Sequence, residues 1–202
     1  MLLKRGAEAE LRRTRWHGRD AVEKLRVPKS YRLASLDDRL RTERTRSEVR
    51  LMSDARKAGV AVPIIYDVDL EERRITMQYV AGPTAKRVLD RGGPRAQALC
   101  GKIGRLAARL HRAGIAHGDL TPSNLIVARG RLWAIDFSLG ERTTEVEARG
   151  VDLHLVREAL VAAHRHGEAY FAEVGRAYRR GYPAGAVALA KAEEIRLRGR
   201  YT

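Results

Sequence analysis

Residues 117–136 read H-G-D-L-T-P-S-N-L-I-V-A-R-G-R-L-W-A-I-D, and this stretch decides the fold of the chain. Asp119 and Asn124 are separated by four residues, in the pattern D-x-x-x-x-N. After Asn124, two short apolar runs flank a turn at residues 129–130, which predicts a β-hairpin. Because a hairpin returns the chain to its starting point, we expect Asp136 to lie beside Asp119 and Asn124.

These three side chains suit phosphoryl transfer, and D-x-x-x-x-N is the spacing of a kinase catalytic loop. The carbonyl of Asn124 and the carboxylate of Asp136 are suitable ligands for Mg²⁺. Asp119 can orient the hydroxyl group or water that accepts the phosphoryl group. An ordinary turn, with Asp119 and Asn124 capping local backbone, is the alternative. The joint spacing favours catalysis.

The composition is strongly basic. Forty Lys and Arg residues face 25 Asp and Glu residues in a chain of 202, which gives a formal net charge of +15. This imbalance favours a polyanionic partner such as RNA, or an acidic protein surface, although a solvated Arg-rich surface remains the alternative. The length suits one compact unit, or two small lobes that share a cleft.

Cysteine content and hydropathy set further expectations. Cys100 is the only cysteine, so an intrachain disulfide is excluded, and we expect it to be a core residue. Apolar runs fall short of the roughly 18 residues of a membrane span, and we identify no signal peptide at the N-terminus. We therefore expect a cytoplasmic protein.

The first 81 residues are expected to form an N-terminal lobe with an antiparallel sheet. A turn at Gly6 would close over a triphosphate, or be an ordinary hairpin turn. Lys24 lies in the strand predicted over 21–26, in an x-V-x-K pattern typical of the lysine that pairs with nucleotide phosphates. Arg26 and Lys29 are competitors for that role. Glu48 lies in the helix predicted over 36–58 and is expected to pair with Lys24.

Strands predicted over 64–69 and 75–80 lead to a Gly82-Pro83 break. We interpret residues 77–82 as a hinge whose backbone can bond an adenine, with a simple strand-to-helix turn as the alternative. Residues 82–195 are expected to form a mostly helical C-terminal lobe, and residues 196–202 a basic tail.

Within this C-terminal lobe, helices are predicted over 96–113, from 151 to about 164, and over 168–183. Asp152 is expected to cap or anchor the second of these helices against the 117–136 stretch. Only 15 residues separate Asp136 from Asp152, and they lack an A-P-E-like sequence. So short a connection argues against ordinary phosphorylation of protein substrates.

Short motifs occur in a fixed order along nearly the whole chain. They are G-A-E-A at 6–9, V-E-K-L-R-V-P-K-S-Y-R at 22–32, R-T-R-S-E at 44–48, H-G-D-L-T at 117–121, S-N at 123–124, I-D-F at 135–137, V-D-L at 151–153 and R-L-R-G-R at 196–200. In this order they resemble the small atypical kinase subunit of the KEOPS complex, the Bud-thirty-two family, of archaeal type. The K-x-Y-R and R-T-x-x-E pieces are more specific than general kinase motifs.

The resemblance implies a minimal bilobal protein-kinase-like α+β fold with a short C-terminal lobe. It implies a catalytic Asp119 and the binding of ATP and Mg²⁺ by four further residues, Lys24, Glu48, Asn124 and Asp136. It also implies an ATPase or regulatory subunit, capable of Ser/Thr autophosphorylation, in the complex that forms threonylcarbamoyl-adenosine in tRNA. The implied partners are the threonylcarbamoyl-transferase subunit at the C-terminal lobe and a small subunit at the N-terminal lobe. The basic tail would support the activity of the complex, and tRNA contact is open.

The chain departs from the family pattern at Pro122, at Ser138 in place of glycine, and over 147–150. Two other functions compete with the leading one. The first is a stand-alone kinase of proteins or small hydroxyl compounds, because H-G-D-x-x-x-x-N also resembles aminoglycoside and choline kinases. The second is a non-catalytic scaffold or RNA-binding subunit stabilised by nucleotide.

Overall fold

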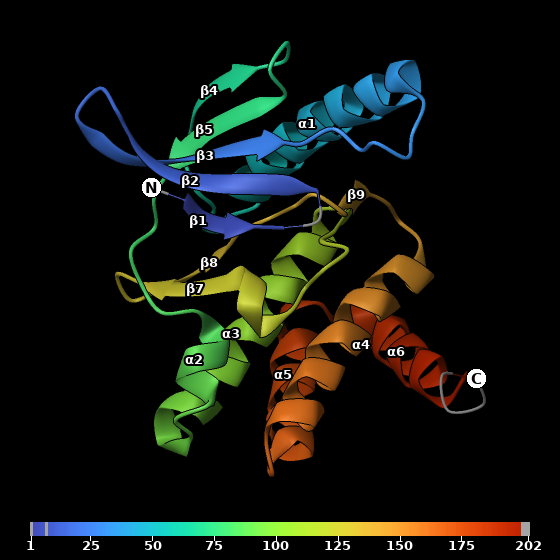
Figure 1. Cartoon of the computed structure of the whole chain (residues 1–202). Helices are drawn as coiled ribbons and strands as arrows, with labels where there is room; N and C mark the ends of the chain where they lie inside the picture. Colours follow the sequence, from blue (N-terminus) through green and yellow to red (C-terminus); the bar gives the residue numbers. More distant parts are fainter. Residues whose placement is uncertain (1, 7, 199–202) are drawn as a thin grey trace.

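The computed structural model describes residues 2–6 and 8–198, and it divides into a sheet-containing N-terminal part and a helical C-terminal part (Figure 1). The N-terminal part contains β1 (Leu2–Arg5), β2 (Ala9–Trp16), β3 (Arg19–Arg26), α1 (Ala34–Lys57), β4 (Ile65–Asp69) and β5 (Arg74–Gln78). The C-terminal part contains α2 (Ala85–Leu89), α3 (Gly93–Arg112), β6 (Ile115–Ala116), η1 (Pro122–Asn124), β7 (Leu125–Ala128), β8 (Arg131–Ala134), β9 (Glu141–Arg142), α4 (Val146–Ala163), α5 (Gly167–Gly181), η2 (Pro183–Gly185) and α6 (Ala186–Arg198). The α+β prediction is confirmed.

The N-terminal sheet has the order β1-β2-β3-β5-β4, with antiparallel neighbours throughout. Lys24 on β3 lies opposite Leu11 on β2 and Ile75 on β5, so it occupies the middle of the sheet. Helix α1 packs along this sheet (Figure 1). Its buried face includes Thr45, Glu48, Leu51, Met52 and Ala55, a helical spacing that places Glu48 on the same side as the apolar core.

The C-terminal part is built around α3, which packs against α5. Gly104 permits the close crossing, because a Cβ atom there would collide with the carbonyl oxygen of Val174. Cys100 is fully buried in this core, as predicted. Burial and the nearby Glu173 carboxylate raise the pKa of its thiol to about 12, so it is a packing residue.

The structure extends the helical part further than the sequence analysis predicted. The helix predicted over 168–183 is α5, and a helix that the sequence analysis did not predict follows it, since Pro183 opens a short 3-10 turn and α6 begins after that turn. Alanine favours helix, and the small Ala188 and Ala192 allow α6 to pack on α4. Helix α6 continues across the boundary expected after residue 195. Residues 199–202 of the expected tail lie outside the described residues.

The chain passes from the sheet to the helices through Gly82-Pro83, as the predicted break requires. A Cβ atom at Gly82 would collide with the carbonyl oxygen of Val127, so glycine is needed for this close approach. The carbonyl oxygen of Pro83 accepts a 2.9 Å hydrogen bond from the N–H of Val127. The connection between the two parts is therefore tied to β7. Among residues 2–6 and 8–198, none of the helices has the length and apolar character to cross a membrane.

Candidate active site

The buried carboxylate of Asp152 holds the backbone of the loop that carries Asp119. Asp152, in α4, accepts hydrogen bonds from the backbone N–H groups of His117 (2.6 Å) and Gly118 (2.8 Å). Gly118 has φ 76°, and a Cβ atom there would collide with Leu139. Asp152 lies inside α4 rather than at its cap, so it anchors the loop, which is one of the two roles that the sequence predicted.

A chain of hydrogen bonds continues from Asp152 into the core. His111 Nε2 lies 3.1 Å from Asp152 Oδ2, and His111 Nδ1 lies 2.8 Å from the hydroxyl of Tyr178 in α5. His111, Asp152 and Tyr178 are all fully or almost fully buried. The loop is thereby connected to α3, α4 and α5 together.

The His117 side chain braces the loop through hydrogen bonds to backbone groups. Its Nε2 donates to the carbonyl oxygen of Ile135 (3.1 Å), and its Nδ1 accepts from the N–H of Asp119 (3.4 Å). These contacts specify a neutral ring protonated on Nε2. Burial lowers the pKa of His117, although the nearby Asp152 carboxylate opposes this shift.

The predicted hairpin returns the chain to the loop that carries Asp119. Strands β7 and β8 pair in antiparallel register, and the N–H of Ile135 donates to the carbonyl oxygen of Asn124 (3.0 Å). Asn124 Nδ2 donates to Asp119 Oδ2 (2.7 Å) and to the Asp119 carbonyl oxygen (3.0 Å). Asp119, Asn124 and Asp136 therefore meet at one place, because the hairpin brings Asp136 back next to the loop.

Asp136 occupies an unusual backbone conformation at the end of the hairpin. Its φ is 65°, in the left-handed region, which costs a residue other than glycine about 1–3 kcal/mol. Its Oδ1 accepts hydrogen bonds from Lys24 Nζ (2.7 Å) and Ser138 Oγ (2.6 Å). Burial raises the pKa of Asp136, but the charge and hydrogen bonds of Lys24 and Ser138 outweigh it and hold the pKa well below its usual range.

Glu48 receives two cations from the same strand. Lys24 Nζ lies 2.6 Å from Glu48 Oε1, and Arg26 Nη2 lies 2.7 Å from Glu48 Oε2. Residues 24 and 26 point to the same face of β3, since strand side chains alternate. The exposed fractions of the Lys24, Glu48 and Arg26 side chains are 5%, 1% and 2%, so the cluster is almost dry. Lys29, the other residue considered for the phosphate-binding role of Lys24, lines neither of the two cavities described next.

The six site residues predicted from the sequence line two adjoining cavities between the parts. A cavity of about 390 Å³ is lined by Lys24, Glu48, Asn124 and Asp136. A second, of about 310 Å³, is lined by Gly6, Asp119, Lys24 and Asp136. Gly6 lies in the turn between β1 and β2, which is closed by a 2.9 Å hydrogen bond from its N–H to Ala9.

The larger cavity has an apolar end beside the connection between the parts. Its apolar lining includes Val22, Met77, Val80, Ile126 and Ile135. Among the residues that the structure describes, the backbone N–H of Val80 has no hydrogen-bond acceptor. An apolar slot with a spare backbone donor suits a flat heteroaromatic ring such as adenine.

The polar end fits Mg²⁺ only together with a ligand that brings further oxygens. In the described part of the chain, His, Cys, Asp and Glu side chains form no group of three or more able to hold a metal by themselves. Asn124 donates through its amide nitrogen, which leaves its carbonyl oxygen as an acceptor beside the Asp136 carboxylate. Mg²⁺ typically takes one or two such protein oxygens and completes its shell with phosphates and water.

Sequence reasoning missed two members of the cluster. Arg26 was weighed as a rival to Lys24, whereas the structure shows both bound to Glu48. The i, i+2 spacing on a strand contained that signal. Ser138 was noted only as a departure, whereas its hydroxyl contacts both Lys24 and Asp136.

Comparison with solved structures supports the fold. A chain from the structure titled "WaaP in complex with acyl carrier protein" has a TM-score of 0.65 and 20% sequence identity, and the match covers 96% of this chain and 86% of that chain. At this identity the similarity shows a shared fold alone.

Curated relatives share much more sequence. The "KEOPS complex subunit Bud32" of Pyrococcus abyssi is 39% identical over 211 residues, covering 99% of this chain and 96% of the relative. The "Probable serine/threonine-protein kinase BUD32 homolog" of Archaeoglobus fulgidus is 40% identical, covering 97% of this chain and 94% of the relative. A "Probable bifunctional tRNA threonylcarbamoyladenosine biosynthesis protein" of Methanosarcina barkeri is 42% identical over 184 residues. That match covers 91% of this chain but 32% of the relative, so the chain spans about a third of the bifunctional protein.

The bilobal kinase-like fold, the converging polar residues and these relatives agree with one another. Residues 21–150 match the RIO domain, a region that contains five of the six site residues, Lys24, Glu48, Asp119, Asn124 and Asp136. The chain therefore belongs to the RIO-domain family and, within it, to the group of the Bud32 proteins.

Proposed function

We propose that this chain binds ATP with Mg²⁺ in the cleft and acts as a kinase-type ATPase that supports the threonylcarbamoylation of tRNA in the cytoplasm. One observation carries the proposal. Five polar residues come from β3, from α1, from the loop over 117–124 and from the end of the β7–β8 hairpin, and they line adjoining cavities of about 390 and 310 Å³. They are Lys24, Glu48, Asp119, Asn124 and Asp136. Lys24 pairs with Glu48 and Asp136 in the ligand-free protein, so the burial of these charges is compensated. Exchangeable charged groups beside an apolar slot suit a charged ligand that carries a flat ring.

Each residue has a distinct role in this proposal. The ammonium group of Lys24 would leave Asp136 and bind a phosphate oxygen instead. The ion pair with Glu48 would keep that ammonium group in position. Asn124 and Asp136 would hold Mg²⁺, which when bound neutralises charge on the phosphates. Asp119 would accept the proton of the attacking hydroxyl group or water as the bond to the leaving diphosphate breaks. Gly6 and its turn would cover the phosphates.

The short segment after Asp136 supports an ATPase over a kinase of folded proteins. Helix α4 begins at Val146, and only the two-residue strand β9 lies between. Strand β9 pairs with β6, which holds this segment against the catalytic loop. Little backbone is therefore left to align an extended peptide substrate.

The relatives support work in a complex. The Pyrococcus abyssi relative is named a complex subunit, and the Methanosarcina barkeri relative carries a similar segment within a longer bifunctional protein named for tRNA threonylcarbamoyladenosine biosynthesis. We infer that this chain likewise acts beside a threonylcarbamoyl-transferase, held by its C-terminal part, with a small subunit at its N-terminal part.

ATP hydrolysis by the purified chain, alone and with the cognate transferase subunit and tRNA, tests this function. Hydrolysis that the partner stimulates and that Asp119→Asn abolishes is the expected result. Hydrolysis that ignores the partner would favour the stand-alone kinase. Its absence in every mixture, with ATP binding retained, would favour the scaffold function.

A further inference from the structure

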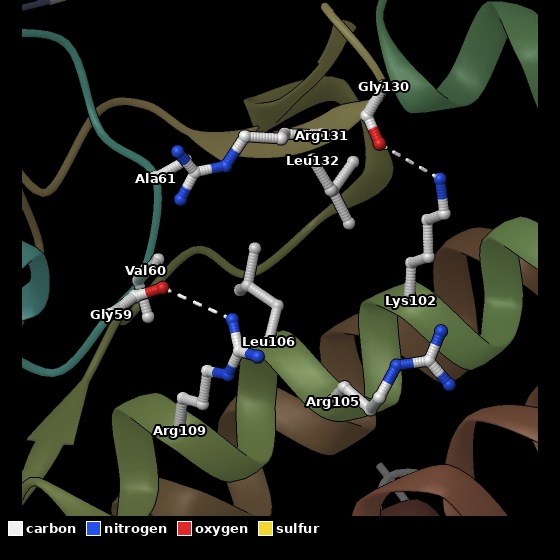
Figure 2. A pocket seen from close by; sticks show the side chains of 10 residues that line it. All are labelled: Gly59, Val60, Ala61, Lys102, Arg105, Leu106, Arg109, Gly130, Arg131 and Leu132. Atoms are coloured by element: carbon white, nitrogen blue, oxygen red, sulfur yellow. Dashed lines mark hydrogen bonds between the residues drawn. The ribbon is translucent and has the colours of Figure 1, made fainter.

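A third cavity, a pocket of about 250 Å³, lies outside the cleft, where three segments meet. Its walls are the turn after α1 (Gly59, Val60 and Ala61), one face of α3, and the β7–β8 turn (Gly130, Arg131 and Leu132). Figure 2 shows Leu106 and Leu132 pointing toward one another in the middle of the pocket, with basic side chains around them. None of the six site residues lines it.

The charged groups that line this pocket are all positive. Lys102, Arg105 and Arg109 project from α3, and Arg131 begins β8. Within the described parts of the chain, the guanidinium groups of Arg105 and Arg131 have no hydrogen bond or ion pair. Glu173, the carboxylate close to Gly101, is bound by Arg176 and Arg180 instead of by Arg105. Four cations therefore line one hollow, and within the described residues none of them is ion-paired with a carboxylate.

The pocket is held open by fixed backbone contacts. Lys102 Nζ donates to the carbonyl oxygen of Gly130 (3.2 Å), and Arg109 Nη1 donates to that of Gly59 (3.1 Å). Figure 2 shows these two bonds reaching from α3 to opposite walls. The N–H of Ala134 also donates to Ala61 (2.8 Å), which joins the two walls to each other. The site is thus formed before any ligand arrives, which lowers the entropic cost of binding.

Two further arginines belong to segments that adjoin the pocket walls. Arg56 donates to the carbonyl oxygens of Val62 and Pro63, just after the first wall. Arg129 is exposed and immediately precedes Gly130 in the β7–β8 turn. A single small anion would use the pocket alone, whereas a chain of phosphates could use the pocket and its flanks.

We propose that this pocket binds phosphate groups of an RNA backbone, so that the tRNA of the proposed function contacts the chain here. Guanidinium forks match phosphate oxygens, and the formal net charge of +15 gives the whole chain an attraction for a polyanion. An acidic protein segment fits less well. Leu106 and Leu132 are only 6% and 8% exposed, so the pocket offers little apolar surface on which peptide side chains could anchor.

The test measures binding of the full chain to a fluorescently labelled tRNA transcript over a range of salt concentrations. The double variant Arg105→Ala/Arg131→Ala removes the two unpaired cations and, within the described residues, no hydrogen bond or ion pair. The matched control, Arg46→Ala/Arg50→Ala, removes two exposed arginines of α1 and so the same charge. We expect the pocket variant to bind about 10-fold more weakly and to lose about 1–2 units of salt slope, with a smaller loss in the control.

Equal losses in the two variants would overturn the proposal, because the effect would then be one of net charge. Unchanged RNA binding in the pocket variant would also overturn it. If that variant instead loses binding of a labelled polyglutamate peptide, the pocket takes an acidic protein segment. ATP hydrolysis, measured in parallel, should be the same in both variants. The inference rests on the proposed tRNA-linked function, but pocket-dependent RNA binding without hydrolysis would refute only the ATPase role.

Discussion

The Oγ atom of Ser138 lies 2.7 Å from the Nζ atom of Lys24. The same hydroxyl lies 2.6 Å from Asp136 Oδ1, so it sits between the ion-paired groups at the polar end of the cleft. A glycine here, the residue that the family pattern leads one to expect, would supply no such group. Ser138 therefore strengthens the contact that Lys24 and Asp136 would give up in the proposed binding of a nucleotide.

Ser138→Gly is expected to tighten the binding of Mg²⁺-ATP several-fold. The variant removes the hydrogen bonds of this hydroxyl with Lys24 and Asp136, which together contribute on the order of 1 kcal/mol, from the ligand-free protein. Isothermal titration calorimetry measures the change, and Ser138→Thr, which retains the hydroxyl, should bind like the wild type. Identical affinities for all three proteins would show that Ser138 has no part in restraining Asp136.

Asp136 and Asp119 are expected to respond differently to substitution. Asp136→Asn removes one charge and suits the left-handed conformation at φ 65°, since asparagine tolerates it. We expect it to weaken Mg²⁺-ATP binding by more than about 100-fold. This loss exceeds the one typical for residues that contact a metal's ligands and not the metal itself. Asp119→Asn should leave affinity within about 2-fold and lower kcat by about 10²–10⁴-fold. Comparable affinity in Asp136→Asn and the wild type would refute the metal assignment.

Asp152→Ala is expected to destabilise the fold by about 3–5 kcal/mol. The change leaves the N–H groups of His117 and Gly118 without their acceptor and His111 without its partner. Urea unfolding gives the free energy. Glu147→Ala, an exposed α4 residue paired with Arg198, should cost less than about 1 kcal/mol. A similar small loss at Asp152 would mean that the loop holds its shape by other contacts.

Stability is expected to fall as the pH drops through the window just below 6.5 because of His117. Burial lowers the pKa of the folded ring below its ordinary value of 6.5, so in this window the unfolded chain takes up a proton that the folded chain does not. The limit is about 1.4 kcal/mol per pH unit. His117→Gln should unfold with a flatter pH dependence, whatever its absolute stability. The low pKa of Asp136 affects stability at a lower pH. Its contribution to the free energy of unfolding is lost only as the pH falls below the ordinary carboxyl pKa of 3.8. Parallel profiles for the wild type and His117→Gln would contradict the assignment.

Local patterns were enough to predict the sheet, the hairpin and the convergence on the cleft. The D-x-x-x-x-N spacing and the turn at residues 129–130 fix short-range geometry, and the structure follows them. Helix α6 was missed because Ala188 and Ala192 form no apolar stripe, and they become buried only against α4. The basic pocket was also out of reach, because Lys102, Gly59 and Arg131 are brought together by tertiary packing alone.

The buried chain Tyr178–His111–Asp152 has a consequence for movement. The loop that carries Asp119 shares its fixed contacts with three helices of the core, so it can shift only if the whole C-terminal part loosens. Lys24, by contrast, is held by side-chain bonds that a nucleotide can replace one at a time. Entry of a ligand should therefore leave Asp119 stationary. The N-terminal sheet would move relative to the fixed C-terminal part.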